Sequence, residues 1–443
     1  MRIAYLAAGA AGMYCGSCLH DNTLAAALRK AGEDILLVPT YTPLRTDEED
    51  VSLPRVFFGG INVYLQQKFP LFRRTPWWLD RVLDRPRMLA RLASRASSVS
   101  AAELGDMTVS MLQGEHGHQK KELDKLLYWL EQDVRPEVIH LSNALLTGMA
   151  PRLKERIGAP IVCSLSGEDI FTENLTPPYY DQARALLRQN CLHVDAFVAL
   201  NNYYAAYMVE YLGIERDRIH VIQHGLNLQG HGTRRTRTAD EPLAIGYFAR
   251  VCPDKGLHLL AEAFASLARD ASLPPLRLRV AGYLGPSDRR YLAEIEIKLK
   301  RQGLADRYEY AGQLDRAEKI DFLQSLDVFS VPAVYRESKG ISVLEAMANA
   351  VPVVVPEHGT YPELIELTGG GLLCRPHDAA SLADSLARLI ASPQQADEMG
   401  RRGQAAIREQ FEAGRMAAKT AALYRQVIEQ REVRPIASGP QPD

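Results

Sequence analysis

The stretch from Glu337 to Val355 reads Glu-Ser-Lys-Gly-Ile-Ser-Val-Leu-Glu-Ala-Met-Ala-Asn-Ala-Val-Pro-Val-Val-Val. Its apolar spacing predicts a helix over 341–349 that ends at Val351-Pro352, followed by a buried strand over 353–355. Gly340 allows close backbone approach where this helix begins, and the N–H groups of a first helical turn form an anion site. The stretch therefore indicates an α/β sheet with an anion site at a helix start.

Two carboxylates bracket that anion site. Glu345 lies one turn into the predicted helix, where it can accept hydrogen bonds from a ribose, and Glu337 lies in the preceding loop. A carboxylate for a ribose, amides for a diphosphate and a carboxylate for a sugar together fit a nucleotide-sugar site. The alternative is a Rossmann-like half-sheet whose glutamates only cap and solvate a helix.

These residues resemble the Glu-x7-Glu motif of the family 4 retaining glycosyltransferases, which have the GT-B fold of two Rossmann-like doubly wound α/β domains. Further segments resemble the family's signatures and fall in the expected order. They are residues 244–256, 278–282, 310–314, 327–332 and 369–378. The match is good over the last half of the chain and looser over the first.

The resemblance implies a role for each matching residue. Arg250 and Lys255 would grip the donor diphosphate during catalysis, and Glu337 would contact hydroxyls of the donor sugar in a reaction that retains anomeric configuration. The remaining donor-binding residues would be Gly16, Gly282, Leu314, Gly340, Ile341, Ser342 and Glu345. The alternative for Arg250 and Lys255 is a pair of surface bases near a turn.

The departing diphosphate needs cations or aligned dipoles where its charge accumulates. No Asp-x-Asp metal signature lies beside a nucleotide-binding strand, whereas Arg250 offers a planar fork and Lys255 a point charge. We therefore expect no metal and no other cofactor, with the nucleotide-diphosphate sugar as co-substrate.

The organisation predicts two lobes with a ligand cleft between them. Short apolar strands separated by helix-like stretches form the first, acceptor-side domain over 1–224, and a polar stretch over 225–242 forms a linker. The nucleotide-sugar domain follows over 243–410, and a helix over 411–431 crosses back onto the first lobe. Residues 432–443 are predicted as a flexible tail.

The first lobe departs from its relatives after the predicted strand 160–165. Ser166 falls where many family members carry a histidine that hydrogen-bonds the donor sugar. Ser166, Glu168 or Asp169 could replace it, and either acid could orient an acceptor hydroxyl. The equally weighted alternative is an N-capping cluster at a helix start.

The loop over 9–17 is rich in glycine and should face the cleft, so that Gly12 and Gly16 can lie against donor phosphate or acceptor. Cys15 and Cys18 in this region also resemble a thioredoxin-like redox motif, and they make a poor zinc site. The favoured alternative is two small residues that pack a tight loop.

Residues 68–95 combine Trp77 and Trp78 with many arginines. Such a segment can be an amphipathic element at an anionic membrane surface, an arm that stacks on an acceptor sugar, or an ordinary helical hairpin. Peripheral membrane contact is therefore one hypothesis for this chain.

The 443 residues are 47% hydrophobic and 24% charged, with a formal net charge of −2 and six cysteines. This balance argues against a nucleic-acid partner, and the cysteine usage fits a cytoplasmic protein. Residues 1–8 are expected to be a strand and not an export signal. The expected function is a hexosyl transfer from a nucleotide sugar to a hydroxyl acceptor. The alternatives are a non-catalytic GT-B binding protein, or a GT-B epimerase or phosphorylase.

Overall fold

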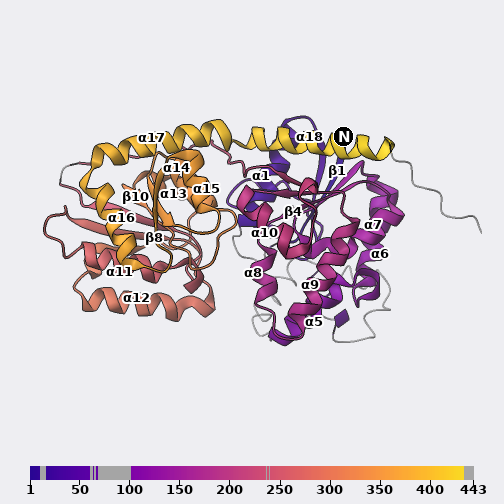
Figure 1. The fold of residues 1–443 in the computed structure, drawn as a ribbon, viewed down its shortest axis with the longest axis horizontal. Helices are drawn as coiled ribbons and strands as arrows, with labels where there is room; N and C mark the ends of the chain where they lie inside the picture. Colours follow the sequence, from indigo (N-terminus) through magenta and orange to yellow (C-terminus); the bar gives the residue numbers. More distant parts are fainter. Residues whose placement is uncertain are drawn as a thin grey trace, which may run out of the picture. The chain divides into compact units, whose positions relative to one another are not determined.

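Apolar runs of strand length separated by helices favour parallel sheets, and the computed structural model contains two of them (Figure 1). It describes residues 1–9, 16–59, 63, 66–67, 101–235, 237–238 and 240–433. Gly12, Cys15 and the segment 68–95 lie outside the described residues, as does most of the predicted tail. The chain divides into a first unit of Met1–Gln223 with the part from Gly414 onward, and a second unit of His224–Ala413.

The first unit contains a parallel sheet in the order β2-β1-β3-β4-β5-β6. Ile3 of β1 pairs with Ile35 of β2 on one side and with Val138 of β3 on the other. The strands are β1 (Arg2–Ala7), β2 (Asp34–Pro39), β3 (Val138–Leu141), β4 (Ile161–Leu165), β5 (Ala196–Ala199) and β6 (Ile219–Val221). The strands predicted at 1–8 and 160–165 are confirmed as β1 and β4, to within one residue at each end.

Helices cover both faces of this sheet, because alternate strand residues point to opposite sides. Ile3 and Tyr5 pack with residues of α1 and α18, whereas Ala4 and Leu6 pack with residues of the other helices. The helices are α1 (Gly16–Lys30), α5 (Ala101–Leu112), α6 (Lys120–Trp129), α7 (Ala150–Arg156), α8 (Glu168–Glu173), α9 (Tyr179–Asn190), α10 (Asn202–Leu212) and α18 (Ala413–Val433).

Helix α18 carries the last described residues back to the first unit. Its Tyr424 is fully buried, and the Tyr424 hydroxyl lies 2.6 Å from His140 Nδ1 on β3. His140 Nε2 lies 2.8 Å from the Ser164 hydroxyl on β4. Burial, with a smaller contribution from His20, lowers the pKa of His140 to about 3, so a neutral imidazole joins the helix to the sheet.

The second unit has a parallel sheet in the order β12-β11-β10-β7-β8-β9. Its strands are β7 (Leu243–Phe248), β8 (Leu276–Ala281), β9 (Tyr308–Tyr310), β10 (Val328–Phe329), β11 (Val353–Pro356) and β12 (Gly371–Cys374). Its helices are α11 (Leu257–Leu267), α12 (Arg289–Arg301), α13 (Arg316–Gln324), α14 (Ile341–Ala348), α15 (Tyr361–Thr368), α16 (Ala379–Ala391) and α17 (Pro393–Gln410). The helix and strand predicted around Val351-Pro352 are confirmed to within one residue.

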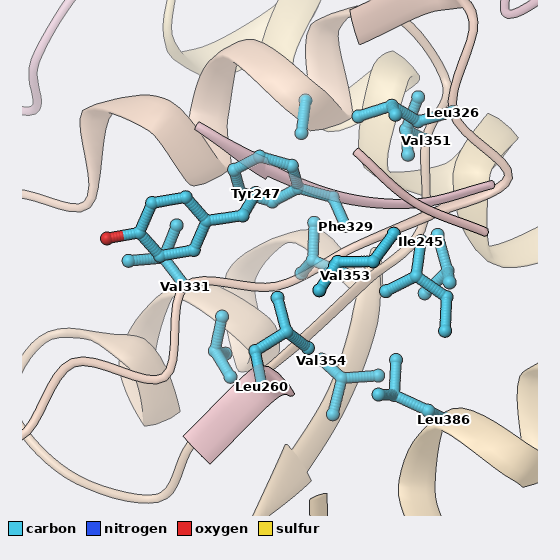
Figure 2. Close-up of a cluster of buried hydrophobic side chains, with 14 of the residues drawn as sticks. Ile245, Tyr247, Leu260, Leu326, Phe329, Val331, Val351, Val353, Val354 and Leu386 are labelled. Carbon is cyan, nitrogen blue, oxygen red and sulfur yellow. The ribbon is translucent and has the colours of Figure 1, made fainter. Parts of the chain in front are cut away.

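Apolar side chains from the central strands fill the core of the second unit (Figure 2). Ile245 and Tyr247 of β7, Phe329 of β10, and Val353 and Val354 of β11 are each fully buried. Strands that are covered on both faces read as continuous apolar runs, which is why these segments could be recognised in the sequence.

The predicted linker 225–242 belongs to the second unit, and charged contacts attach part of it there. Arg234 forms ion pairs with Asp327 and Asp397, and Arg237 Nε lies 3.7 Å from Asp327 Oδ1. These side chains line a cavity of about 290 Å³ at the amino ends of β7 and β10.

Within the described ranges, no helix is long and apolar enough to cross a bilayer.

Candidate active site

The strand order of the second unit indicates at which edge of its sheet a ligand would bind. Strands β7 and β10 are neighbours, but the chain continues from β7 towards β8 and β9 and from β10 towards β11 and β12. Ligands of open α/β sheets bind beyond the carboxyl ends of strands at such a switch point. Arg250 and Lys255 follow β7, and Glu337 follows β10, so the three predicted catalytic residues belong to the two loops at this point.

Glycine allows these two loops to touch. Gly256 has φ +73°, and a Cβ there would lie 1.9 Å from the carbonyl oxygen of Pro332 after β10. The Val334 N–H donates to the Asp254 carbonyl at 2.8 Å, which joins the loops directly. Arg250 is exposed, and its carbonyl accepts a hydrogen bond from the Tyr247 hydroxyl at 3.0 Å.

A cluster of three side chains lies where the loops meet. Lys255 Nζ is 2.5 Å from Glu337 Oε2, and the Tyr335 hydroxyl donates to the same oxygen at 2.8 Å. Lys255 also donates to the Tyr335 hydroxyl and lies 4.8 Å from the centre of its ring. The other carboxylate oxygen, Oε1, accepts from the backbone N–H groups of Ser338 and Lys339, each at 3.2 Å.

The charges in this cluster stabilise one another. Glu337 is 7% exposed. Burial alone would favour its neutral acid, but the charge of Lys255 and hydrogen bonds from Lys255 and Tyr335 outweigh burial and lower the pKa of Glu337 from 4.5 to about 2. Burial alone would lower the pKa of Lys255, but the charge of Glu337 outweighs burial, so the pKa of Lys255 is raised. The site therefore holds a carboxylate and an ammonium group, both charged at neutral pH.

Helix α14 begins beside this cluster. Gly340 has φ +69° and occupies the N-cap position, and no side chain caps the helix. Ile341 and Ser342 in its first turn are half-buried, and first-turn N–H groups have no partner within a helix. The glutamates of the motif thus neither cap α14 nor lie in solvent, as the alternative interpretation would have required.

Glu345 is 3% exposed and pairs with a residue that the sequence analysis missed. Lys319 Nζ of α13 lies 2.5 Å from Glu345 Oε1, and Lys319 is 2% exposed. The available signal was its position, since Lys319 precedes the buried residues Phe322 and Leu323 by one helical turn.

Gly282 and Leu314 lie at the same edge of the sheet. Gly282 has φ +133°, and a Cβ there would meet the Ala249 carbonyl oxygen at 1.9 Å. The Gly282 N–H donates to the Gly312 carbonyl at 2.8 Å, which ties the ends of β8 and β9 together. Leu314 is half-buried and packs against the apolar core of the second unit.

The predicted acceptor-side residues lie after β4 in the first unit. Glu168 is 3% exposed, with Oε1 accepting from the Ala144 N–H at 2.8 Å and Oε2 from the Ser166 N–H at 2.7 Å. The Tyr204 hydroxyl donates to Asp169 Oδ1 at 2.6 Å. Burial raises the pKa of both carboxyl groups. Gly167 is the N-cap of α8 and has no side chain to cap it, while Glu168 and Asp169 lie in the first turn of the helix.

The glycine-rich loop ends earlier than expected. Gly16 is the first residue of α1 and not a loop residue. The helix starts early because Cys18 is 1% exposed and joins the same buried helix face as Ala25. A reactive thiol needs access to solvent, so burial of Cys18 disfavours the redox hypothesis. Among the described residues, no group of three or more His, Cys, Asp or Glu could hold a metal ion.

Two parallel α/β units, with motif residues gathered at the switch point of the second, define the architecture of a two-domain glycosyltransferase. Residues 233–406 match the family model described as glycosyl transferases group 1, and residues 22–225 match the glycosyl transferase 4-like domain. The chain belongs to this family of GT4-type transferases with the GT-B fold.

Curated relatives include the putative colanic acid biosynthesis glycosyltransferase WcaL of Escherichia coli, which is 29% identical over 56% of this chain and 60% of its own length. D-inositol 3-phosphate glycosyltransferase of Nocardia farcinica is 30% identical over 48% of this chain and 49% of its own length. The chain thus spans about half to three fifths of the length of these two relatives.

Solved structures with the same fold cover nearly the whole chain. Sucrose-phosphate synthase from Thermosynechococcus elongatus aligns with a TM-score of 0.71 and 18% identity, covering 97% of this chain and 100% of its own. Anabaena HepE in complex with UDP-glucose aligns with a TM-score of 0.63 and 17% identity, covering 96% and 100%.

Proposed function

We propose that this protein transfers a sugar from a nucleoside-diphosphate sugar to a hydroxyl acceptor. The observation that carries the proposal is the contact between Lys255 and Glu337, on the two loops at the switch point, beside the glycine-capped start of α14. In this proposal Arg250, Lys255 and the amides at Gly340–Ser342 hold the diphosphate. Glu337 contacts the donor sugar. The structure of Anabaena HepE in complex with UDP-glucose, which has the same fold, supports this class of donor.

The leaving diphosphate is stabilised in this proposal without a metal ion. Lys255 is held at the site by Glu337 and Tyr335, and Arg250 stands exposed on the same loop. A fixed cation and first-turn amides stabilise developing negative charge without having to reorganise during the reaction. The relation to GT4-type enzymes further supports transfer with retention of anomeric configuration.

The remaining proposed contacts follow from position. Glu345 takes the ribose, while Gly282 and Leu314 lie at the ends of β8 and β9 where the base and diphosphate would approach. In the first unit, Gly16, Ser166, Glu168 and Asp169 remain proposed for the donor phosphate and the acceptor. Membrane contact through 68–95 remains a proposal that a flotation assay with anionic liposomes would test, and a cytoplasmic location remains a proposal that cell fractionation would test.

A thermal-shift screen of UDP-, GDP- and ADP-sugars tests the donor site. A ligand that binds only the folded state raises the melting temperature. We expect one nucleotide class to stabilise the wild type and to have no effect on Arg250→Ala/Lys255→Ala. The matched control is Arg290→Ala/Lys300→Ala, which removes two exposed cations from α12 and should respond as the wild type does. The absence of any shift in the wild type would favour a binding module without transferase activity.

Metal independence and retention need turnover measurements. With the donor identified, turnover should be unchanged after EDTA treatment, and NMR of the product should show the anomeric configuration of the donor. Loss of turnover that Mg²⁺ restores would refute the metal-independent mechanism, and an inverted product would refute retention.

A further inference from the structure

The ion pair between α13 and α14 is almost completely withdrawn from solvent. Lys319 Nζ and Glu345 Oε1 are 2.5 Å apart, with side chains that are 2% and 5% exposed. The Glu345 backbone is fixed as well, because the Asn349 side-chain amide donates to the Glu345 carbonyl at 2.9 Å. Lys319 therefore holds the carboxylate, and Asn349 holds the backbone that carries it.

Stability alone does not explain such a pair. Removing two charges from water costs several kcal/mol per ion, and apolar residues of similar volume often serve a fold as well or better. The neighbours of Lys319 on α13 include Phe322 and Leu323, which belong to the apolar core, so an apolar side chain would suit this helix face. A function of the charged form of Glu345 is the better explanation.

The state of the carboxylate decides what it can bind. A buried carboxyl group without a cation favours its neutral acid. The neutral acid carries a proton on one oxygen, whereas the ionised form only accepts hydrogen bonds. Two vicinal ribose hydroxyls that both donate require the ionised form.

We propose that Lys319 is a positioning residue for ribose recognition, which holds the Glu345 carboxylate ionised and aimed at the ribose. The inference rests on the proposed function, since it takes Glu345 as the ribose contact. Lys319 acts through Glu345, because its ammonium group lies 2.5 Å from that carboxylate and its side chain is only 2% exposed. Lys255 differs, since its side chain is 19% exposed beside a Glu337 side chain that is 10% exposed.

The preference for ribonucleotides over deoxyribonucleotides tests this role, because a purely structural role of Lys319 would not change that preference. Calorimetry would compare UDP, GDP and ADP with dUDP, dGDP and dADP for the wild type, Lys319→Met and Lys319→Arg. One lost hydrogen bond to a charged group corresponds to about a tenfold loss of affinity. We expect the wild type to prefer the ribonucleotide about tenfold. Lys319→Met should show almost no preference because its ribonucleotide affinity falls, and Lys319→Arg should restore the preference.

Two further variants show whether a lost preference for ribose comes from the missing charge of Lys319 or from a general disturbance of the fold. Lys319→Gln removes the charge but keeps a hydrogen-bond donor, and should lose the preference for ribose as Lys319→Met does. Lys125→Met is the matched control, because Lys125 Nζ lies 2.9 Å from the buried Glu122 on α6 of the first unit. It removes a lysine from another ion pair and should leave the ribose preference unchanged.

The outcomes separate this inference from the function on which it rests. If no diphosphate binds the wild type, the proposed function itself fails. If the wild type binds ribo- and deoxynucleotides equally, the diphosphate site stands but the role of Glu345, and with it that of Lys319, is refuted. The inference is also overturned if folded Lys319→Met and Lys319→Gln keep the preference, or if they lose both nucleotides in equal proportion.

Discussion

Each unit buries a pair of acidic side chains near strand ends, and the two pairs have different kinds of partner. In the second unit, Glu337 and Glu345 each contact a lysine from another element, at 2.5 Å in both cases. In the first unit, Glu168 accepts hydrogen bonds from the N–H groups of Ala144 and Ser166, and Asp169 accepts one from the Tyr204 hydroxyl.

This difference shifts the pKa values of the two pairs in different ways. The lysine at Glu337 lowers its pKa to about 2, whereas burial raises the pKa of Glu168 and of Asp169. Glu337 contacts a lysine side chain, whereas Glu168 joins the backbone at Ala144 to that at Ser166 and cannot change partners without loosening that connection. Under the proposed function, the second pair carries the chemistry, and we expect Glu168 to act on the acceptor side by positioning its loop.

The largest effect is expected when one acid of the second-unit pair is removed. Glu337→Ala should reduce turnover by roughly 10²–10³-fold, because interactions made in the transition state are lost, while nucleotide affinity changes little. Initial rates and calorimetry on the same preparation would measure both. Glu366→Ala, an exposed glutamate on α15, is the control and should change neither. Equal losses of rate and affinity would make Glu337 an ordinary binding residue.

A smaller effect should follow from breaking the first-unit pair. Glu168→Gln should lower the free energy of unfolding by about 2 kcal/mol, since Gln has only one side-chain oxygen and one of the two N–H groups loses its acceptor in a buried position. Urea unfolding would measure it, with the exposed Glu173→Gln on the same helix as the control. Nucleotide binding should be unchanged. A stable Glu168→Gln protein with lost turnover would instead place Glu168 among the substrate contacts.

The smallest expected effect concerns pH and has opposite signs for the two acids. The folded pKa of Glu337, about 2, is below its ordinary 4.5, so its contribution is present above pH 4.5 and is lost as pH falls towards 2. The folded pKa of Glu168 is raised, so its contribution is present at low pH and is lost as pH rises through that value.

Urea unfolding at several pH values would detect this difference. Between about pH 5 and pH 3.5, the stability advantage of the wild type over Glu337→Gln should shrink by about 1 kcal/mol. The advantage over Glu168→Gln should grow or stay constant over the same interval. Parallel pH profiles for the two variants would contradict the assignment of different partners.

The second unit could be predicted well because its signals are local. Apolar strand runs, Gly340 and Pro352 each report on their own neighbourhood, and they predicted α14, β11 and the loop that carries Glu337. Lys319 could not be predicted as a partner of Glu345, because 26 residues separate the two and only the packing of α13 on α14 brings them together. The same holds for Tyr335, whose hydroxyl meets Lys255 across two loops.

The first unit was harder to predict for a physical reason. Its strands were recognisable, but the roles of Glu168 and Asp169 depend on Ala144 and Tyr204, which lie in other loops and helices. Short polar side chains after a strand are compatible with capping, catalysis and loop bridging alike. The start of α1 at Gly16 was missed because glycine and serine suggest a loop until the burial of Cys18 is known.

The hydrogen bond between Tyr424 and His140 has a consequence for the order in which the protein is made. Helix α18 covers a sheet face of the first unit, yet the ribosome adds it only after residues 224–413. At typical rates of synthesis this interval lasts roughly 10–40 seconds. During that time Ile3, Tyr5 and Val138 lack part of their apolar cover. A nascent chain of this protein is thus exposed to aggregation in its oldest part, while its middle part can already fold as a continuous segment.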